Sequence, residues 1–113
     1  MADHIKIRPA TGTWVVRAGG AVLGESKNAI ELVEGDYPPV IYFPRADIAM
    51  AFLEPSDGKS TCPYKGEASY FDIHAKSGPI AKAAWSYEDP IGDVAEIKGH
   101  LAFYTNKVAV EQV

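Results

Sequence analysis

Turn-forming residues interrupt this sequence at intervals of about ten residues, and the runs between them are short and rich in β-branched and aromatic residues. Gly19-Gly20 separates residues 14–17 from residues 21–25 and supplies the positive φ angles of a tight hairpin turn. Pro38-Pro39 excludes a helix and precedes another extended run at residues 40–43. About seven or eight such runs predict a mostly β domain, with two antiparallel sheets in a small sandwich or open barrel.

One segment departs from the extended pattern. Asp47 can cap one or two helical turns over residues 48–53, although six apolar residues are also compatible with a buried strand. Residues 56–61 are predicted to form a polar loop, and residues 94–97 a short helical turn. We therefore expect at most a few turns of helix in the domain.

The second half of the chain contains the clearest alternation. In residues 68–75, apolar and polar side chains alternate, which predicts a strand with one core face and one polar face. Residues 83–87 predict a second strand that presents Trp85 and Tyr87 on one face. Residues 101–104 and 108–110 are interpreted as a closing hairpin.

Length and charge limit the classes of function. The 113 residues fit a single domain, residues 1–113, and the net charge is −4, with basic residues scattered singly. Binding of nucleic acid or of an anionic membrane is not expected from this balance. The longest apolar stretch is far too short to span a bilayer and the N-terminus has no signal-peptide pattern, so a cytoplasmic location is expected.

The cysteine and histidine content argues against a metal or a cofactor. Cys62 is the only cysteine, which excludes an internal disulfide and paired-cysteine zinc sites. The three histidines have no ligand-like spacing. We expect no metal and no cofactor.

Several motifs occur in an order that identifies a family. Residues 62–70 read C-P-x-K-G-x-A-S-Y, and further motifs occur at residues 42–47, 84–87 and 99–104. Together they resemble the bacterial domain of unknown function 427 (DUF 427), which implies a β-tent-like fold of two antiparallel sheets. The family is sometimes named nucleotidyltransferase-like, but it supplies no catalytic residues, and Gly24-Glu25-Ser26 lacks the carboxylate pair that such enzymes need.

A ligand-binding pocket is the first functional hypothesis. Tyr70, Trp85 and Tyr87 could line an aromatic pocket on a sheet face, with Arg45 and Asp47 at its rim. In the alternative interpretation the aromatic rings fill the core, and Arg45 and Asp47 are only an ion pair and a helix cap. The expected ligand is a small polar or aromatic molecule.

A small enzyme is the second hypothesis. Cys62 could act as a nucleophile if Lys65 or His74 activated its thiol, with a nucleotide as substrate if the family name is meaningful. In the alternative interpretation none of the three residues is catalytic. Cys62 is then a small buried hydrophobic residue, Lys65 is solvated at the entrance of a strand, and His74 lies on the surface. A third hypothesis is a homo-oligomeric structural module, because exposed strand edges can pair.

Overall fold

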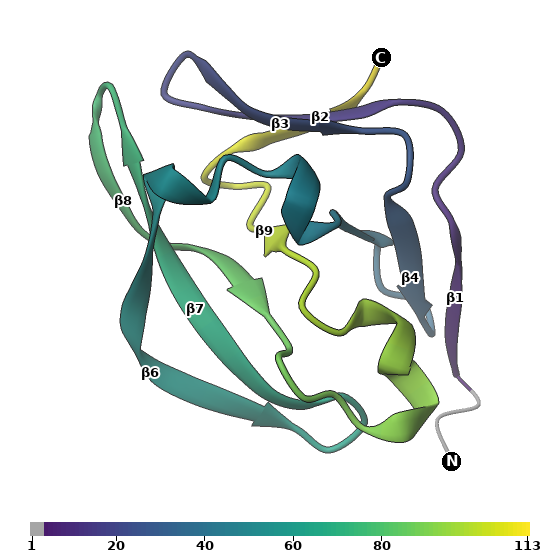
Figure 1. The fold of residues 1–113 in the computed structure, drawn as a ribbon. Coiled ribbons are helices and arrows are strands. Elements are labelled where there is room, and N and C mark those ends of the chain that lie inside the picture. The colour runs from purple at the N-terminus through teal and green to yellow at the C-terminus, as the bar shows by residue number, and fades with distance from the viewer. Residues whose placement is uncertain (1–3) are drawn as a thin grey trace.

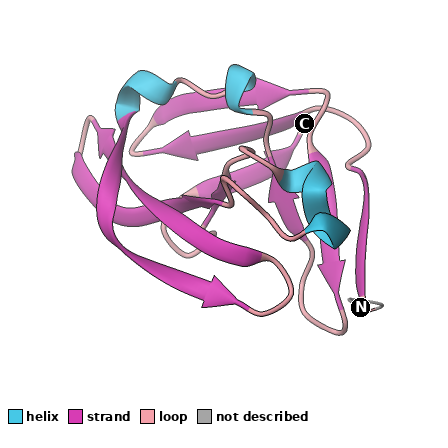
Figure 2. Cartoon of the chain, turned by 60° about the horizontal axis from the view of Figure 1, so that its bottom comes forward, coloured by secondary structure: helices cyan, strands magenta, loops and turns pink. Residues whose placement is uncertain are grey.

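The computed structural model describes residues 4–113, which form ten short strands and three 3-10 helical segments (Figure 1, Figure 2). The strands are β1 (Ile5–Pro9), β2 (Trp14–Ala18), β3 (Ala21–Ser26), β4 (Ile30–Glu34), β5 (Val40–Tyr42), β6 (Leu53–Cys62), β7 (Gly66–Ala75), β8 (Gly78–Ser86), β9 (Ala102–Phe103) and β10 (Ala109–Gln112). The helical segments are η1 (Arg45–Asp47), η2 (Met50–Phe52) and η3 (Gly92–Ile97). The predicted mostly β class is confirmed.

The strands form three antiparallel sheets rather than two. Their orders are β1-β4-β5, β10-β2-β3 and β6-β7-β8-β9. In Figure 1 the three sheets lie at the right, at the top and at the left of the molecule. The first and third sheets are joined by a single antiparallel bridge between Phe43 and Leu101. Its two hydrogen bonds join the backbone of Phe43 and Leu101 in both directions, at 2.8 and 2.9 Å.

The predicted hairpin around Gly19-Gly20 is confirmed. β2 and β3 pair across this turn, and the two glycines have φ angles of 54° and 84°. Positive φ at both central positions is what a two-residue hairpin turn requires. The extended run predicted at residues 40–43 corresponds to β5 and to the bridge residue Phe43.

The region around the predicted helix differs from the expectation in two ways. Asp47 does not cap residues 48–53: η2 has no side-chain cap, and Asp47 instead accepts a hydrogen bond of 2.7 Å from Ser26 Oγ. Residues 56–61, predicted as a loop, belong to β6, which forms the edge of its sheet. An edge strand tolerates polar residues, proline and glycine because only one side of it pairs, which is why the composition resembled a loop.

The predicted C-terminal hairpin is also wrong. β9 pairs with β8, whereas β10 pairs with β2 in another sheet. The intervening turn brings the chain from one sheet to the other, with the amide N–H groups of Lys107 and Val108 both donating to the Tyr104 carbonyl. Local sequence gives no information about which distant strand each segment will meet.

The core consists of two hydrophobic clusters. The larger lies between the second and third sheets and includes the fully buried residues Val16, Phe43, Ile73 and Leu101. The smaller lies between the first and third sheets and consists of Leu32, Tyr42, Ala68, Tyr87, Val94, Ile97 and Ala102. Trp85 and Tyr70 pack against the smaller cluster while remaining partly exposed, which places them at its boundary with solvent.

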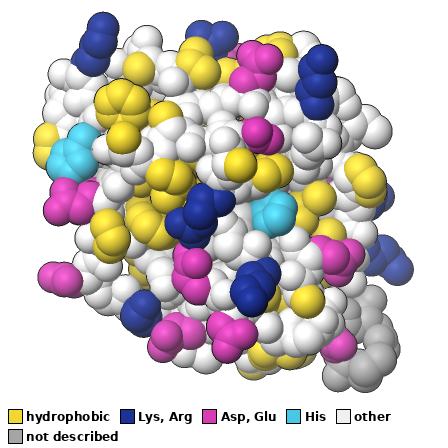
Figure 3. All heavy atoms as spheres, in the orientation of Figure 1, with side chains coloured by type: hydrophobic (Ala, Val, Ile, Leu, Met, Phe, Trp, Pro, Cys, Tyr) yellow, Lys and Arg dark blue, Asp and Glu magenta, His cyan; other side chains and the backbone are white. Residues whose placement is uncertain are grey.

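The surface has no dominant charge on the face shown in Figure 3, where acidic and basic side chains are interspersed. In the described part of the chain, no helix is long and apolar enough to cross a bilayer.

We expect the substitution Gly24→Ala to lower the free energy of unfolding by about 1–3 kcal/mol, because it overpacks the contact between β3 and η1. A Cβ atom at Gly24 would lie 2.4 Å from the carbonyl oxygen of Asp47 and 2.7 Å from Ile48 Cδ1. Urea unfolding of both variants measures the effect. Gly92→Ala is the control, since no atom lies within 4 Å of its added Cβ; equal midpoints for the two variants would contradict the packing argument.

Candidate functional site

A hollow of about 230 Å³ lies between β4 and β5 of the first sheet and β7 and β8 of the third. We call it the aromatic pocket. Tyr70 and Trp85 are direct partners on β7 and β8, so both side chains project from the same face of that sheet. The pocket is lined by Leu32, Glu34, Tyr37, Pro38, Val40, Tyr42, Lys65, Ala68, Tyr70, Trp85, Tyr87 and Tyr104.

Trp85 is the centre of the aromatic wall. Its indole N–H donates a hydrogen bond of 3.3 Å to the Tyr42 hydroxyl, and the two rings meet edge to face with centroids 6.3 Å apart. On its other side, the ring of Tyr104 lies with its centroid 4.5 Å from that of Trp85. These contacts fix the orientation of the indole while leaving part of it exposed to the pocket.

The charged groups of the pocket, Lys65 and Glu34, form an ion pair. Lys65 Nζ lies 2.7 Å from Glu34 Oε1, and only 11% of the Lys65 side chain is exposed. The hydrogen bond from Lys65, opposed by partial burial, lowers the pKa of the Glu34 carboxyl. Burial disfavours the charged form of Lys65, but the pKa of its ammonium is raised overall because Glu34 accepts its hydrogen bond. The pair is therefore charged at neutral pH.

The turn between β6 and β7 places Lys65 in this position. Its amide N–H donates to the carbonyl of Cys62 at 3.2 Å, and its own carbonyl accepts from Ile91 at 3.0 Å. Gly66 follows with a φ angle of 110°, a conformation that side-chain-bearing residues rarely adopt. A tight turn fastened to residues 89–91 thus points the lysine toward the first sheet.

Three phenol groups of the pocket, those of Tyr42, Tyr87 and Tyr104, remain neutral over a wide pH range. Burial raises the pKa of Tyr42 and of Tyr87, the latter with further contributions from neighbouring groups. Burial and a hydrogen bond with Tyr70 raise the pKa of Tyr104 to about 12. These hydroxyls can donate and accept hydrogen bonds, but they are poor candidates for a base near neutral pH.

The aromatic pocket continues into a wider groove of about 790 Å³. The two share Glu34, Tyr37, Val40, Trp85 and Tyr104, among others. The groove adds mainly apolar side chains: Trp14, Pro39, Ile41, Phe103 and Val110. Together the two hollows offer a polar inner end and an apolar outer end.

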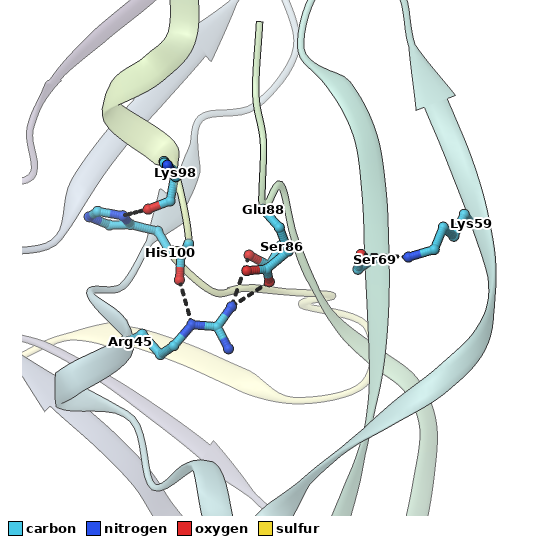
Figure 4. Close-up of polar contacts among 8 residues, drawn as sticks. Arg45, Lys59, Ser69, Ser86, Glu88, Lys98 and His100 are labelled. Carbon is cyan, nitrogen blue, oxygen red and sulfur yellow. Dashed lines mark hydrogen bonds and ion pairs between the residues drawn. The ribbon is translucent and has the colours of Figure 1, made fainter.

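Two residues predicted at the pocket rim lie elsewhere in the described structure. Arg45 donates to the Gly99 carbonyl at 3.0 Å and to Ser86 Oγ at 3.3 Å, and it pairs with Glu88 (Figure 4). Asp47 is bonded to Ser26 on β3. Neither lines the aromatic pocket, and both connect η1 to neighbouring elements.

The predicted catalytic candidates are not brought together as a group. Cys62 and Lys65 are neighbours across the β6–β7 turn, and Cys62 is half-buried beside the smaller cluster. His74 lies near the opposite end of β7, where it pairs with Glu54 at 2.5 Å. Of the predicted site residues, the structure places Lys65, Tyr70, Trp85 and Tyr87 around the aromatic pocket.

Sequence reasoning missed Glu34, Tyr42 and Tyr104. The burial of Lys65, which requires a carboxylate or another acceptor nearby, would point to such a partner, but only the structure shows that burial. Nothing in the sequence shows that residue 34 meets residue 65. Among residues 4–113, no group of three or more His, Cys, Asp or Glu side chains is placed to hold a metal ion.

The fold and the pocket together define a small all-β protein with an aromatic hollow between two sheets. Residues 6–113 match the family model described as Domain of unknown function (DUF427), and the chain belongs to this family. A search of the curated proteins finds no match.

Proposed function

We propose that the protein binds a small planar molecule, aromatic or conjugated, in the aromatic pocket. The observation that carries this proposal is the half-buried Lys65–Glu34 pair in a hollow walled by Tyr70, Trp85 and Tyr104. Concave sites with aromatic walls and a few converging polar groups are typical of small-molecule binding.

The pair suits a ligand edge that both accepts and donates hydrogen bonds. A lysine ammonium carries three N–H donors. Glu34 accepts one of them and Cys62 interacts with the same ammonium, which leaves one donor for a ligand acceptor. The Glu34 carboxylate can accept from a ligand N–H or O–H. A planar amide or a heteroaromatic ring presents such an edge, and its face can stack on Trp85. The pocket volume of about 230 Å³ fits roughly one or two rings, and the apolar groove can receive any extension.

Thermal denaturation with benzamide, nicotinamide, adenine and indole-3-carboxamide tests the proposal. A ligand present at 100 times its dissociation constant adds about 2.7 kcal/mol of stability. We expect at least one of these probes to stabilise the protein, and we expect calorimetry to show that Trp85→Leu removes binding while Trp85→Phe retains most of it. Lys65→Met should weaken binding by roughly tenfold through loss of a charge-assisted hydrogen bond.

The control variant is Tyr64→Leu, which alters an exposed aromatic residue in the same β6–β7 turn but outside the pocket. It should bind the probe as the unmodified protein does. The proposal fails if no probe shifts the unfolding transition, or if Trp85→Leu and Lys65→Met, shown to be folded by circular dichroism, bind with unchanged affinity.

A further inference from the structure

A second hollow, of about 480 Å³, adjoins the aromatic pocket through Tyr70 and Tyr104. We call it the lysine pocket, because it collects three lysines from separate parts of the chain. It is lined by Gly58, Lys59, Ser60, Tyr70, Lys82, Tyr104, Asn106 and Lys107. None of these lining residues is acidic, although the protein as a whole carries a net charge of −4.

A bulge in β8 positions the first lysine. Phe71 pairs with Ala84 and Ile73 with Ile80, so three residues of β8 lie opposite the single residue Asp72 of β7. At the centre of the bulge, Lys82 has a φ angle of 48°, the only positive φ of a non-glycine residue in the described chain. Its amide N–H donates to Asp72 Oδ1 at 2.8 Å. Bulges of this kind redirect a side chain, often beside a functional site.

The same bulge anchors the second lysine. Lys107, in the turn that follows β9, donates from Nζ to the Ala81 carbonyl at 2.7 Å, and this ammonium lies 6.0 Å from the ring centroid of Tyr104. One N–H of Lys107 is therefore used to hold the side chain over the bulge. The remaining donors are available to a ligand.

A second bulge, in β6, brings the third lysine to the edge of this hollow, but its ammonium lies on the opposite face of the sheet. Lys59 is the direct partner of Ser69, whose side chain projects away from that of its neighbour Tyr70. The register shifts between Pro55 and Lys59, and Gly58 within the bulge has a φ angle of 90°. Lys59 Nζ donates to Ser69 Oγ at 3.0 Å (Figure 4). A Cβ at Gly58 would lie 3.2 Å from Lys82 Nζ, which shows that the Lys82 side chain reaches across β7 to the bulge in β6.

The lysines of this pocket form no ion pair in the described chain, although the Asp72 carboxylate accepts the amide N–H of Lys82. Within residues 4–113, no carboxylate lies within ion-pair distance of Lys59, Lys82 or Lys107. Lys82 and Lys107 both line this hollow, and like charges on its walls repel one another, which a bound anion would relieve. The Asn106 amide adds a neutral hydrogen-bond donor to the same hollow, whereas the hydroxyls of Ser60 and Tyr104 both hydrogen-bond to Tyr70.

We propose that the lysine pocket binds a phosphate-like oxyanion, either free or as the phosphate group of a small ester. Lysine is a common phosphate ligand, acting as a point charge with several donors. The backbone at Lys82 agrees with this role: the left-handed region disfavours lysine, and glycine would occupy it without strain, so placing a lysine there has a conformational cost.

Titration with inorganic phosphate tests the proposal without reference to any ligand of the aromatic pocket. Isothermal calorimetry and amide chemical shifts are recorded against sodium chloride at matched ionic strength. We expect saturable binding with shifts centred on the two bulges, and a loss of roughly tenfold in affinity for Lys82→Gln and again for Lys107→Gln. Lys27→Gln, at an exposed lysine outside the pocket, should bind phosphate normally.

Lys82→Gly gives a second readout. Because glycine relieves the strained backbone, this variant should melt at a higher temperature and yet bind phosphate more weakly. The proposal is overturned if phosphate gives no more response than chloride, or if the lysine variants bind it as tightly as Lys27→Gln does.

Phenyl phosphate distinguishes the source of the anion. If the phosphate belongs to an aromatic ester whose ring enters the aromatic pocket, phenyl phosphate binds more tightly than inorganic phosphate and Trp85→Leu removes only the difference. If the anion is free phosphate, the two probes bind equally. Inorganic phosphate binding is the same in both cases, so failure of the aromatic pocket as a ligand site would not be mistaken for failure of the lysine pocket.

Discussion

The substitution Phe43→Ala should lower the free energy of unfolding by about 3–5 kcal/mol, the range for removing a buried aromatic ring. Phe43 is fully buried, and its ring meets that of Phe103 edge to face with centroids 5.8 Å apart. Its backbone also forms the bridge to Leu101 that joins two sheets. The cavity would open where these sheets meet, so relaxation of the surroundings can recover little of the lost packing.

Urea unfolding followed by circular dichroism measures this loss. The matched control is Phe52→Ala, because Phe52 is 49% exposed and the same truncation there should cost less than about 1 kcal/mol. Similar losses for the two variants would show that the bridge region does not depend on the Phe43 ring.

The substitution Glu34→Gln should lower the free energy of unfolding at neutral pH by about 2 kcal/mol. It leaves the Lys65 ammonium, whose side chain is 11% exposed, without its carboxylate. Removing one partner of a fully buried pair costs about 3–5 kcal/mol. The cost is smaller here because Glu34 is 23% exposed. The amide nearly preserves the shape of the side chain, so the change reports the charge.

The loss should depend on pH. Since the pKa of folded Glu34 is lowered from about 4.5, its contribution is present above that value and is lost as the pH falls through the folded pKa. The pKa of Lys65 is raised from 10.5, so its contribution is present below that value and is lost as the pH rises through the folded pKa. The difference between the unmodified protein and Glu34→Gln should therefore be largest between these limits and should shrink in acid.

Urea unfolding at several pH values checks this expectation. Glu31→Gln is the control on the same strand, because Glu31 pairs with Arg8, which is 61% exposed, and such pairs contribute at most about 1 kcal/mol. A constant difference between the Glu34 variant and the unmodified protein down to strongly acid pH would rule out the ion pair as its origin.

Local features of the fold were predictable where one segment determines its own conformation. Gly19-Gly20 specifies its turn regardless of what surrounds it. The alternation around Phe71 and Ile73 likewise predicts the buried face of β7. By contrast, the β6 segment resembled a loop in the sequence because an edge strand accepts the same residues as a loop. The pairing of β10 with β2 could not be predicted because these two strands lie about ninety residues apart in the chain.

The aromatic pocket was likewise predictable only where its residues come from neighbouring strands of one sheet. Tyr70 and Trp85 belong to strands that are adjacent in the chain, so their pairing follows from an ordinary hairpin. Glu34 and Tyr42 come from another sheet, and only the tertiary arrangement brings them there. Arg45 was expected at the rim, but its guanidinium binds Ser86, Glu88 and the Gly99 carbonyl instead.

The walls of the aromatic pocket belong to different hydrogen-bonded sheets, and this affects how they can move. The bridge at Phe43 joins the sheets through backbone hydrogen bonds, whereas the Lys65–Glu34 pair and the Trp85–Tyr42 bond join them through side chains. The smaller hydrophobic cluster also packs between these two sheets, so widening the gap at its buried end would expose core side chains. A ligand thicker than the resting gap is therefore accommodated only where the lining side chains are partly exposed, since these can rearrange without breaking a strand ladder.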